Sequence, residues 1–522
     1  MDLQPQHLNI TRIRLFTALA SLLLSLQAVY FDDIINRDGI MYLQQVEAYL
    51  TGGLASAKLI YDWPAFSIIV AWVHKITSLP IEAAGFLTNS LLFIILTDAI
   101  ILISSLLVTS QRQLAIAAVL VLCFIPINEY RDFILRDPGY WAFSSLALYQ
   151  FMLFVLSPSY KTASLWQLFI VIAILFRIEG SVILFALPFF LFFINPPVLA
   201  IKRFFQSLYL AIISALIALA TLASQTDFSV AFGKLGSISK YLDLDKYLYL
   251  LDKYSTVIEQ QVLNRYSDEY ASQILISGML FMLVYKLLKT FSISYLIICF
   301  ITYFTPSSKE LSARQCLLQQ LLLYFFSLNI FILSMFLFKE YFISSRYAVL
   351  ALVSLLLLVM YRLCHAIENL WFGKKKVLLS IAGLCLFYNL ADAALQSSSK
   401  TYIKETALWA ASNLPDDSLV ITDDEFMLYY FNRELPSSTL CVNKLHHPTA
   451  FTREYAKKIP YINGPCAHAQ SNDYRYYDYL IVVEKERNSE LTAFLKTLQL
   501  KKIYSQENAR LTDSAAVYQV IK

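Results

Sequence analysis

The sequence predicts a polytopic α-helical membrane protein of about eleven spans, in a range of roughly nine to thirteen, followed by an extracytoplasmic α/β domain. Hydrophobic residues form 58% of the 522 residues, charged residues form only 15%, and the mean hydropathy is +0.56. Soluble domains carry about a quarter charged residues. The apolar residues also gather in blocks that span a bilayer or nearly do, such as 15–31, 91–108, 181–194 and 209–222.

The first element is predicted to be an uncleaved membrane helix with a cytoplasmic N-terminus. Arg12 and Arg14 precede it, and Lys and Arg mark cytoplasmic segments. No small-residue cleavage site follows it. The segment 32–84 then lies outside. Its two amphipathic stretches, 40–52 and 64–78, are expected to lie in the membrane interface.

Ten further spans are predicted from apolar blocks and from the basic residues between them. The polar segment 225–270 is expected to form a long outer loop. Lys286 and Lys289 interrupt the region 274–304, where we expect one long or broken crossing. GKKK at 373–376 is the clearest cytoplasmic marker. The predicted spans are 84–109, 113–127, 140–157, 164–178, 181–194, 206–224, 274–304, 315–338, 347–362 and 377–396.

The chain is predicted to divide near residue 396, into a transmembrane domain (1–396) and a small outer α/β domain (397–522). The second part begins with a pattern typical of helix, turn, short strand and helix. A buried strand is expected at 477–484, then a helix to about Leu498, and a final strand in AAVYQVIK.

Composition and motifs disfavour several function classes. The net charge of +4 is spread out, so no basic face predicts nucleic-acid binding. The chain has no Walker loop, GxGxxG or GxSxG motif. If the last domain is outside, Cys441 and Cys466 can form a disulfide, which their spacing alone does not decide. Together with His446, His447 and His468 they fit no zinc-ligand template.

Three aspartates follow the first predicted span: Asp32, Asp33 and Asp38. Asp38 opens the pattern D-x-x-x-Y-L with Tyr42 and Leu43. A carboxylate at the outer interface can act as a general base on a hydroxyl while a lipid substrate stays in the membrane. The alternative is that these residues solvate a loop or cap the helix that begins near Gly39.

The next predicted outer loop, NEYRDFILRDPGYWAF at 128–143, carries a second acidic group. Its two Arg-Asp pairs are Arg131-Asp132 and Arg136-Asp137. They can be local ion pairs, with Pro138 at a helix start. They can also add a second acidic contribution to the same site.

Two further arginines are candidates. Arg177 and Glu179 interrupt an apolar stretch, and ionisable groups there mark either a functional site or a turn between helices. Arg346 and Tyr347 begin a span. A guanidinium there suits a lipid phosphate, although snorkelling to headgroups would also place it there.

The order of these motifs resembles the glycosyltransferase C superfamily. After the acidic residue with Y-L come W-P-x-F, L-T-N-S-L-L, a second acidic loop, R-I-E-G, S-R-Y and an α/β domain. The resemblance covers nearly the whole chain and is strongest to the bacterial branch with the lipid A aminoarabinose transferase and the dolichyl-phosphate-mannose protein mannosyltransferase-like proteins. It implies inverting transfer of a sugar from a polyprenyl-phosphate carrier to a lipid, glycan or protein hydroxyl outside the membrane.

By the same resemblance, Asp38 corresponds to the catalytic carboxylate of the first loop and Asp137 to the acidic residue of the second. Arg177 and Arg346 would hold the carrier phosphate, and Tyr42 would pack beside the base. The remaining substrate-binding candidates are Asp32, Asp33, Arg136, Glu179 and Tyr347.

The chain also departs from the pattern of the family. Asp38-Gly39 stands where many relatives have Asp-Glu, so Asp32 or Asp33 can be the base instead. Trp63-Pro64 stands where P-P is common.

The resemblance predicts no cofactor and no obligatory metal, although some relatives use a divalent ion. It implies a bacterial inner (plasma) membrane enzyme of the cell envelope, surrounded by membrane lipids, with its catalytic face in the periplasm. A transporter or flippase of lipid-linked glycans is the alternative. Such a protein is expected to show internal repeats and broken segments at mid-membrane in both halves. The sequence shows no internal repeat.

Overall fold

The chain forms two compact units. Unit 1 comprises residues 1–26, 87–131 and 136–395, and unit 2 comprises residues 27–86, 132–135 and 396–522. The computed structural model describes residues 10–31, 34–223, 244–305, 311–373, 375–395, 401–415, 418, 420–422, 424–434, 440–442, 478–484, 495, 499–507 and 513–521.

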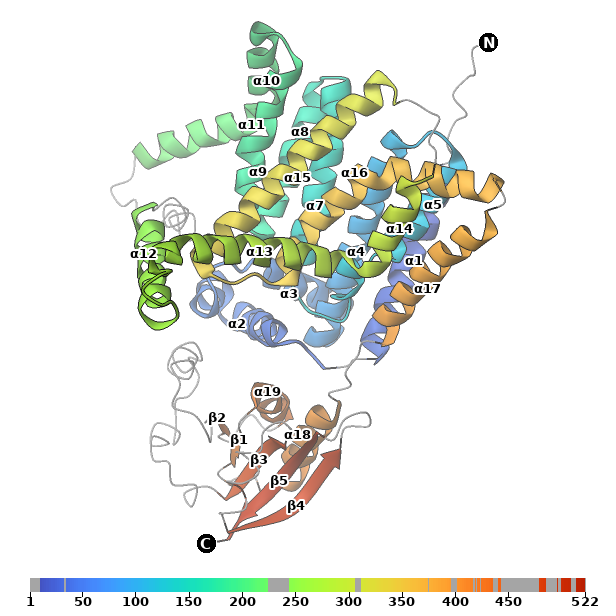
Figure 1. Ribbon diagram of the computed structural model, residues 1–522. Helices are drawn as coiled ribbons and strands as arrows, with labels where there is room; N and C mark the ends of the chain where they lie inside the picture. Colours follow the sequence, from blue (N-terminus) through green and yellow to red (C-terminus); the bar gives the residue numbers. More distant parts are fainter. Residues whose placement is uncertain are drawn as a thin grey trace. The chain divides into compact units, whose positions relative to one another are not determined.

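Helices make up the described part of the chain up to residue 395 (Figure 1). Apart from two helices described with unit 2, they are α1 (Ile10–Phe31), α4 (Ile81–Leu107), α5 (Gln111–Leu122), α6 (Ile125–Asn128), α7 (Asp137–Leu156), α8 (Tyr160–Phe176), α9 (Gly180–Ala186), η1 (Leu187–Phe189), α10 (Phe190–Ile194), α11 (Pro197–Ala223), α12 (Leu244–Gln261), η4 (Asp268–Tyr270), α13 (Ala271–Phe291), α14 (Ile293–Tyr303), α15 (Ala313–Glu340), α16 (Ser345–Phe372) and α17 (Lys376–Leu395).

Seven of the described helices are long and apolar enough to cross a membrane by length and composition, and five apolar helices are shorter. The predicted class, a polytopic helical membrane protein with a C-terminal α/β part, is confirmed. The number of spans stays a prediction.

Helix α1 illustrates how an element of unit 1 suits a bilayer. Its buried residues are Thr17, Ser21 and Ser25, which recur every four residues on one face. Large apolar residues such as Leu15 and Leu23 are exposed. Small polar residues on the packed face and apolar residues on the outer face are typical of membrane helices.

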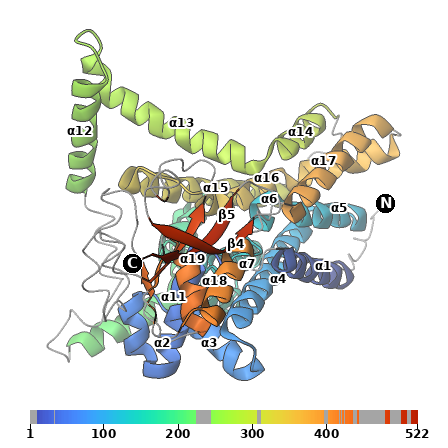
Figure 2. The same ribbon diagram turned by 90° about the horizontal axis from the view of Figure 1, so that it is seen from below.

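The region 274–304 is broken, which was one of the two forms predicted for it. Ser292 has a φ of 75°, which is uncommon for a residue other than glycine, and it separates α13 from α14. Its side chain accepts a hydrogen bond from the Ser294 amide. In Figure 1, α13 lies across the direction of α7 and α8, and Figure 2 shows α13 running from α12 to α14. The predicted outer loop 225–270 contains helix α12 at residues 244–261, while its place outside the membrane stays a prediction.

Unit 2 begins with two packed helices, α2 (Arg37–Ile60) and α3 (Ala65–Thr77). Helix α2 kinks at Gly53, whose φ is 67°. The ring of Tyr42 lies 5.2 Å from that of Phe66, and the Ser67 hydroxyl donates to the Tyr42 carbonyl. Both amphipathic stretches are therefore helical, while their place at a membrane interface stays a prediction.

The C-terminal segment of unit 2 is a five-stranded sheet with two described helices. The strand order is β2-β1-β3-β5-β4. Strands β2, β1 and β3 run parallel to one another, and β5 pairs antiparallel with both β3 and β4. Residues 480–483 of β3 are buried. The elements are α18 (Thr401–Asn413), β1 (Val420–Thr422), α19 (Glu425–Glu434), β2 (Leu440–Val442), β3 (Tyr479–Glu484), β4 (Leu500–Glu507) and β5 (Ser514–Val520).

The predicted helix–strand–helix start and the strands near 477–484 and at the C-terminus are present. Strand β4 was not predicted, because its sequence LKKIYSQE is mostly polar and partly exposed. The helix expected before Leu498 lies almost wholly outside the described residues. So do Cys466 and the three histidines, and the side chain of Cys441 is likewise not described.

Candidate functional site

A charged cluster in unit 1 brings together three of the predicted residues. Asp137 begins α7, while Arg177 and Glu179 lie in the connection between α8 and α9. Arg177 donates from Nη1 to Asp137 and from Nη2 to Glu179, the latter at 2.5 Å. Its Nε donates to the second Glu179 oxygen at 3.3 Å. The guanidinium fork thus bridges carboxylates that are 42 residues apart in the chain.

Close packing of α7 against α8 makes this bridge possible. A Cβ built on Gly139 would lie 2.3 Å from the Phe176 ring, so only glycine allows the two chain segments to come this close. Pro138 occupies the first turn of α7, where its missing amide hydrogen costs nothing. The close approach sets Asp137 beside Arg177.

The cluster is buried and strongly coupled. Asp137 is 2% exposed and Arg177 is 7% exposed. Burial by itself raises the pKa of the Glu179 carboxyl, but the attraction and hydrogen bonds of Arg177, together with the charge of Arg136, lower that pKa to about 2. The lowered pKa keeps the Glu179 carboxylate anionic at neutral pH, while the same guanidinium also bonds Asp137.

A second arginine lies beside the cluster. The Tyr347 ring lies 4.5 Å from the Arg177 guanidinium and 5.0 Å from that of Arg346. Nη2 of Arg346 donates to the Tyr347 hydroxyl at 3.1 Å. The Tyr347 ring thus contacts two cations, and one of them, Arg177, is already bonded to two carboxylates.

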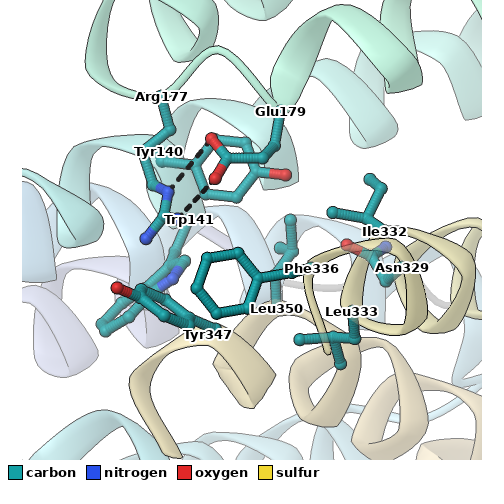
Figure 3. Close-up of a pocket in the computed structure, with 10 residues that line it drawn as sticks. All are labelled: Tyr140, Trp141, Arg177, Glu179, Asn329, Ile332, Leu333, Phe336, Tyr347 and Leu350. Carbon is teal, nitrogen blue, oxygen red and sulfur yellow. Dashed lines mark hydrogen bonds and ion pairs between the residues drawn. The ribbon is translucent and has the colours of Figure 1, made fainter. Parts of the chain in front are cut away.

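A pocket opens next to these residues (Figure 3). One side carries Arg177 and Glu179, and the facing wall comes from α15 and α16 and is mainly apolar. The remaining lining residues are Tyr140, Trp141, Asn329, Ile332, Leu333, Phe336, Tyr347 and Leu350.

Seven of the lining residues were not predicted from the sequence, and three of these differ in the signal that they carry. Asn329 carries a signal that would have found it, because it is a lone amide within an apolar span and is 4% exposed. Tyr140 follows Asp137 by three residues, which places it on the same helix face. Phe336 has no signal that separates it from other span residues.

The remaining predicted residues fall into different parts of the chain. Asp38 lies in the first turn of α2 in unit 2, and Tyr42 follows it by one turn. Arg136 is the residue that precedes α7. Asp32 and Asp33 lie outside the described residues.

Two expectations change with this geometry. Asp137 does not rest on a local pair alone, since it forms an ion pair with Arg177. Arg131 forms no ion pair with Asp132 in the part of the chain that is described. Arg177 was expected to hold a phosphate, yet here its nitrogens bind two carboxylates. Within the described ranges, no group of three or more His, Cys, Asp or Glu side chains is placed to hold a metal ion.

Comparison with known proteins identifies the fold. No family model and no curated protein matches the chain. The structure of ArnT from Cupriavidus metallidurans is 12% identical, with a TM-score of 0.54, and the match covers 97% of this chain and 97% of that chain.

Two other solved structures match with lower TM-scores. The oligosaccharyltransferase of Archaeoglobus fulgidus is 14% identical, with a TM-score of 0.46, over 89% of this chain and 67% of that one. The arabinofuranosyltransferase AftD from Mycobacteria is 11% identical, with a TM-score of 0.46, over 98% of this chain and 40% of that one. On the end-to-end match with ArnT, this chain has the same polytopic fold as that structure.

Proposed function

We propose that the chain is an inverting glycosyltransferase that moves a sugar from a polyprenyl-phosphate carrier to a hydroxyl of a lipid, glycan or protein. The observation that carries this proposal is the pocket of unit 1, in which Arg177 and Glu179 face a mainly apolar wall. Asp137 is bonded to Arg177, and Arg346 lies beside Tyr347 of the pocket lining. A phosphate headgroup with an apolar tail has the matching chemistry. The fold, shared with ArnT, supports the same class of reaction.

In the proposed reaction, Asp38 takes the proton of the acceptor hydroxyl. The acceptor oxygen then bonds to the anomeric carbon from the face opposite the phosphate, which inverts that carbon. The bond from the anomeric carbon to the phosphate oxygen breaks, and the carrier phosphate keeps the electron pair. Arg346 stabilises the charge that develops on the phosphate. A positioned general base contributes roughly 10²–10⁴ in rate.

The role that we propose for Arg177 is to hold Asp137 and Glu179. Its fork is filled by the two carboxylates, so Arg346 is the better phosphate ligand of the two arginines. Asp137 and Glu179 then present fixed acceptors for sugar or acceptor hydroxyls. A bacterial inner membrane, with the reaction on its periplasmic face, is the proposed location.

A transfer assay in membranes tests the proposal. Radiolabelled sugars on polyprenyl phosphates would be given to the wild type, Asp38→Asn and Asp137→Asn at matched expression. We expect carrier-dependent transfer by the wild type and its collapse in Asp38→Asn. Full transfer in Asp38→Asn would assign the base to another aspartate. No transfer from any carrier by folded wild-type protein would contradict the proposal, and lipid flipping would be measured next.

The same assay tests the proposed independence from metal. The reaction as written uses protein groups for both proton removal and phosphate stabilisation, so we expect transfer to persist after treatment with a chelator. Loss of transfer on chelation, with recovery on adding Mg²⁺ or Mn²⁺, would show that a divalent ion is required.

A further inference from the structure

Three segments that are far apart in the sequence meet in unit 2. They are the start of the first loop (34–39), the second-loop segment 132–135 and helix α19 of the C-terminal segment. The Ile35 amide donates a hydrogen bond to the Tyr430 hydroxyl at 3.1 Å. Ile35 is 0% exposed and Tyr430 is 3% exposed. A buried bond of this kind is costly to lose, because the amide would be left without a partner.

The C-terminal segment holds Tyr430 from its other side. The Lys404 ammonium lies 5.2 Å from the centre of the Tyr430 ring, and the Tyr429 ring packs edge-on against it at 5.2 Å. Since α18 and α19 both fix the ring, the hydroxyl is a rigid acceptor for the first loop.

The next residue, Asn36, passes this contact on to the second loop. It stands at the N-cap of α2, but its side chain makes no capping hydrogen bond. Its Oδ1 instead accepts from the Ile134 amide at 2.7 Å. An asparagine at this position ordinarily caps its own helix, so its use elsewhere ties two loops together.

Packing reinforces the tie between the loops. Ile134 is 0% exposed. A Cβ on Gly39 would lie 3.3 Å from the Ile134 Cβ and 2.7 Å from Asn36 Oδ1. Gly39 is therefore the residue that lets the second loop approach this closely. Asp38 precedes Gly39 in the chain, and Asp137 follows Ile134 by three residues.

We propose that the C-terminal domain positions both acidic loops of the enzyme through the relay from Tyr430 to Ile35 and from Asn36 to Ile134. Tyr430 and Asn36 are positioning residues and touch no substrate. The inference rests on the proposed function, because it assigns the relay the task of holding Asp38 and the second-loop segment 132–135, which precedes Asp137 in the chain. It makes the domain a control point for catalysis, at which a ligand or partner of the domain would change the turnover rate.

The test uses the full-length protein in detergent or nanodiscs. Tyr430→Phe removes only the acceptor hydroxyl, and Tyr429→Phe makes the same change one residue earlier as the control. Asn36→Ala breaks the second link without touching the C-terminal domain. For each variant kcat, the KM for the donor, and hydrogen–deuterium exchange of residues 34–40 and 132–135 are measured. Residues 480–483 of strand β3 serve as the reference for a folded domain.

We expect Tyr430→Phe to lower kcat roughly ten-fold, the factor that corresponds to about 1.4 kcal/mol, with little change in KM. Exchange should rise in 34–40 and also in 132–135, and it should stay unchanged in β3. Asn36→Ala should raise exchange in 132–135, and the double variant should lose less than the product of the two single losses. Tyr429→Phe should resemble the wild type.

Wild-type exchange at both loops in Tyr430→Phe would overturn the inference. So would a fall in kcat confined to Asn36→Ala. Faster exchange of β3 in Tyr430→Phe would mean that this variant unfolds the C-terminal domain. The inference would then be tested by Asn36→Ala alone, which must raise the exchange of residues 132–135. A wild type that transfers no sugar would contradict only the proposed function. The exchange measurements need no substrate, so they would still test the relay.

Discussion

Two buried arginines of unit 1, Arg131 and Arg177, differ in the groups that bond their buried positive charge. Arg177 is bonded to two carboxylates. Arg131 is 2% exposed and donates only to neutral oxygens, which are the Asn128 side chain, the Ser21 carbonyl and the hydroxyls of Ser21 and Ser25. Its Nη2 has no hydrogen-bond partner among the described residues. Each guanidinium also lies near an aromatic ring.

The difference separates a structural cation from a functional one. Arg131 ties α1 to the turn after α6, and neutral acceptors suit a bond that never has to change. Around Arg177 the two carboxyl groups offer more acceptor positions than their bonds to this guanidinium use, so the cluster keeps acceptor capacity for a further group. Removing Arg177 would leave the buried Asp137 and the half-buried Glu179 without the guanidinium that bonds both, whereas removing Arg131 would strand no charge.

The largest expected effect is that of Arg177→Met. The stranded carboxylates should cost about 3–5 kcal/mol of stability, and transfer should fall by roughly 10² or more as Asp137 loses its position. Thermal unfolding in detergent and the transfer assay measure the two losses. Arg177→Lys keeps the charge but not the fork, so it should recover stability more than activity. Equal recovery of both would mean that the fork geometry is unimportant.

Arg131→Met should do less harm. Lost hydrogen bonds to a charged donor cost about 1.5–3 kcal/mol each at most, and relief of the buried, unpaired charge offsets part of that cost. We expect the free energy of unfolding to fall by about 1–3 kcal/mol, with transfer per folded molecule unchanged. A greater destabilisation than in Arg177→Met would refute the distinction between the two arginines.

The sequence predicted the helices of both regions but not the partners of these arginines. Apolar blocks and polar turns reveal spans, because the bilayer fixes their length and composition. Partner choice depends on packing between distant segments, such as the approach of Gly139 to Phe176. Arg131-Asp132 therefore looked like a local pair, and Arg177 looked like a phosphate ligand. The polar helix α12 and strand β4 were not predicted, for the related reason that tertiary contacts override local sequence patterns.

Acid should affect only one of the two regions. The Glu179 pKa is lowered from 4.5 to about 2 in the fold, so its stabilising contribution is present above pH 4.5 and is lost as pH falls towards 2. Glu179→Gln should be less stable than the wild type at neutral pH, and the gap in thermal midpoint should close across that window. The gap between Arg131→Met and the wild type should stay constant there. A pH-independent gap for Glu179→Gln would show that the carboxylate is not held by Arg177.

The smallest effects concern the rings beside the two cations. Phe93 lies 4.9 Å from Arg131, and Tyr347 lies 4.5 Å from Arg177. Cation–π contacts contribute about 0.5–2 kcal/mol, with the larger values where the cation is desolvated. Double-mutant cycles of Phe93→Leu with Arg131→Met and of Tyr347→Leu with Arg177→Met isolate each contact from general packing.

We expect the Phe93 coupling to be the larger of the two. Two carboxylates already bond Arg177, so the ring adds little. Arg131 bonds no carboxylate among the residues that the structure describes, so it depends more on the negative face of its ring. Tyr347→Leu should instead raise the KM for the donor a few-fold, because the hydroxyl that orients Arg346 is lost. Equal couplings would mean that the carboxylates do not compete with the ring, and the contrast between the two arginines would then rest on hydrogen bonding alone.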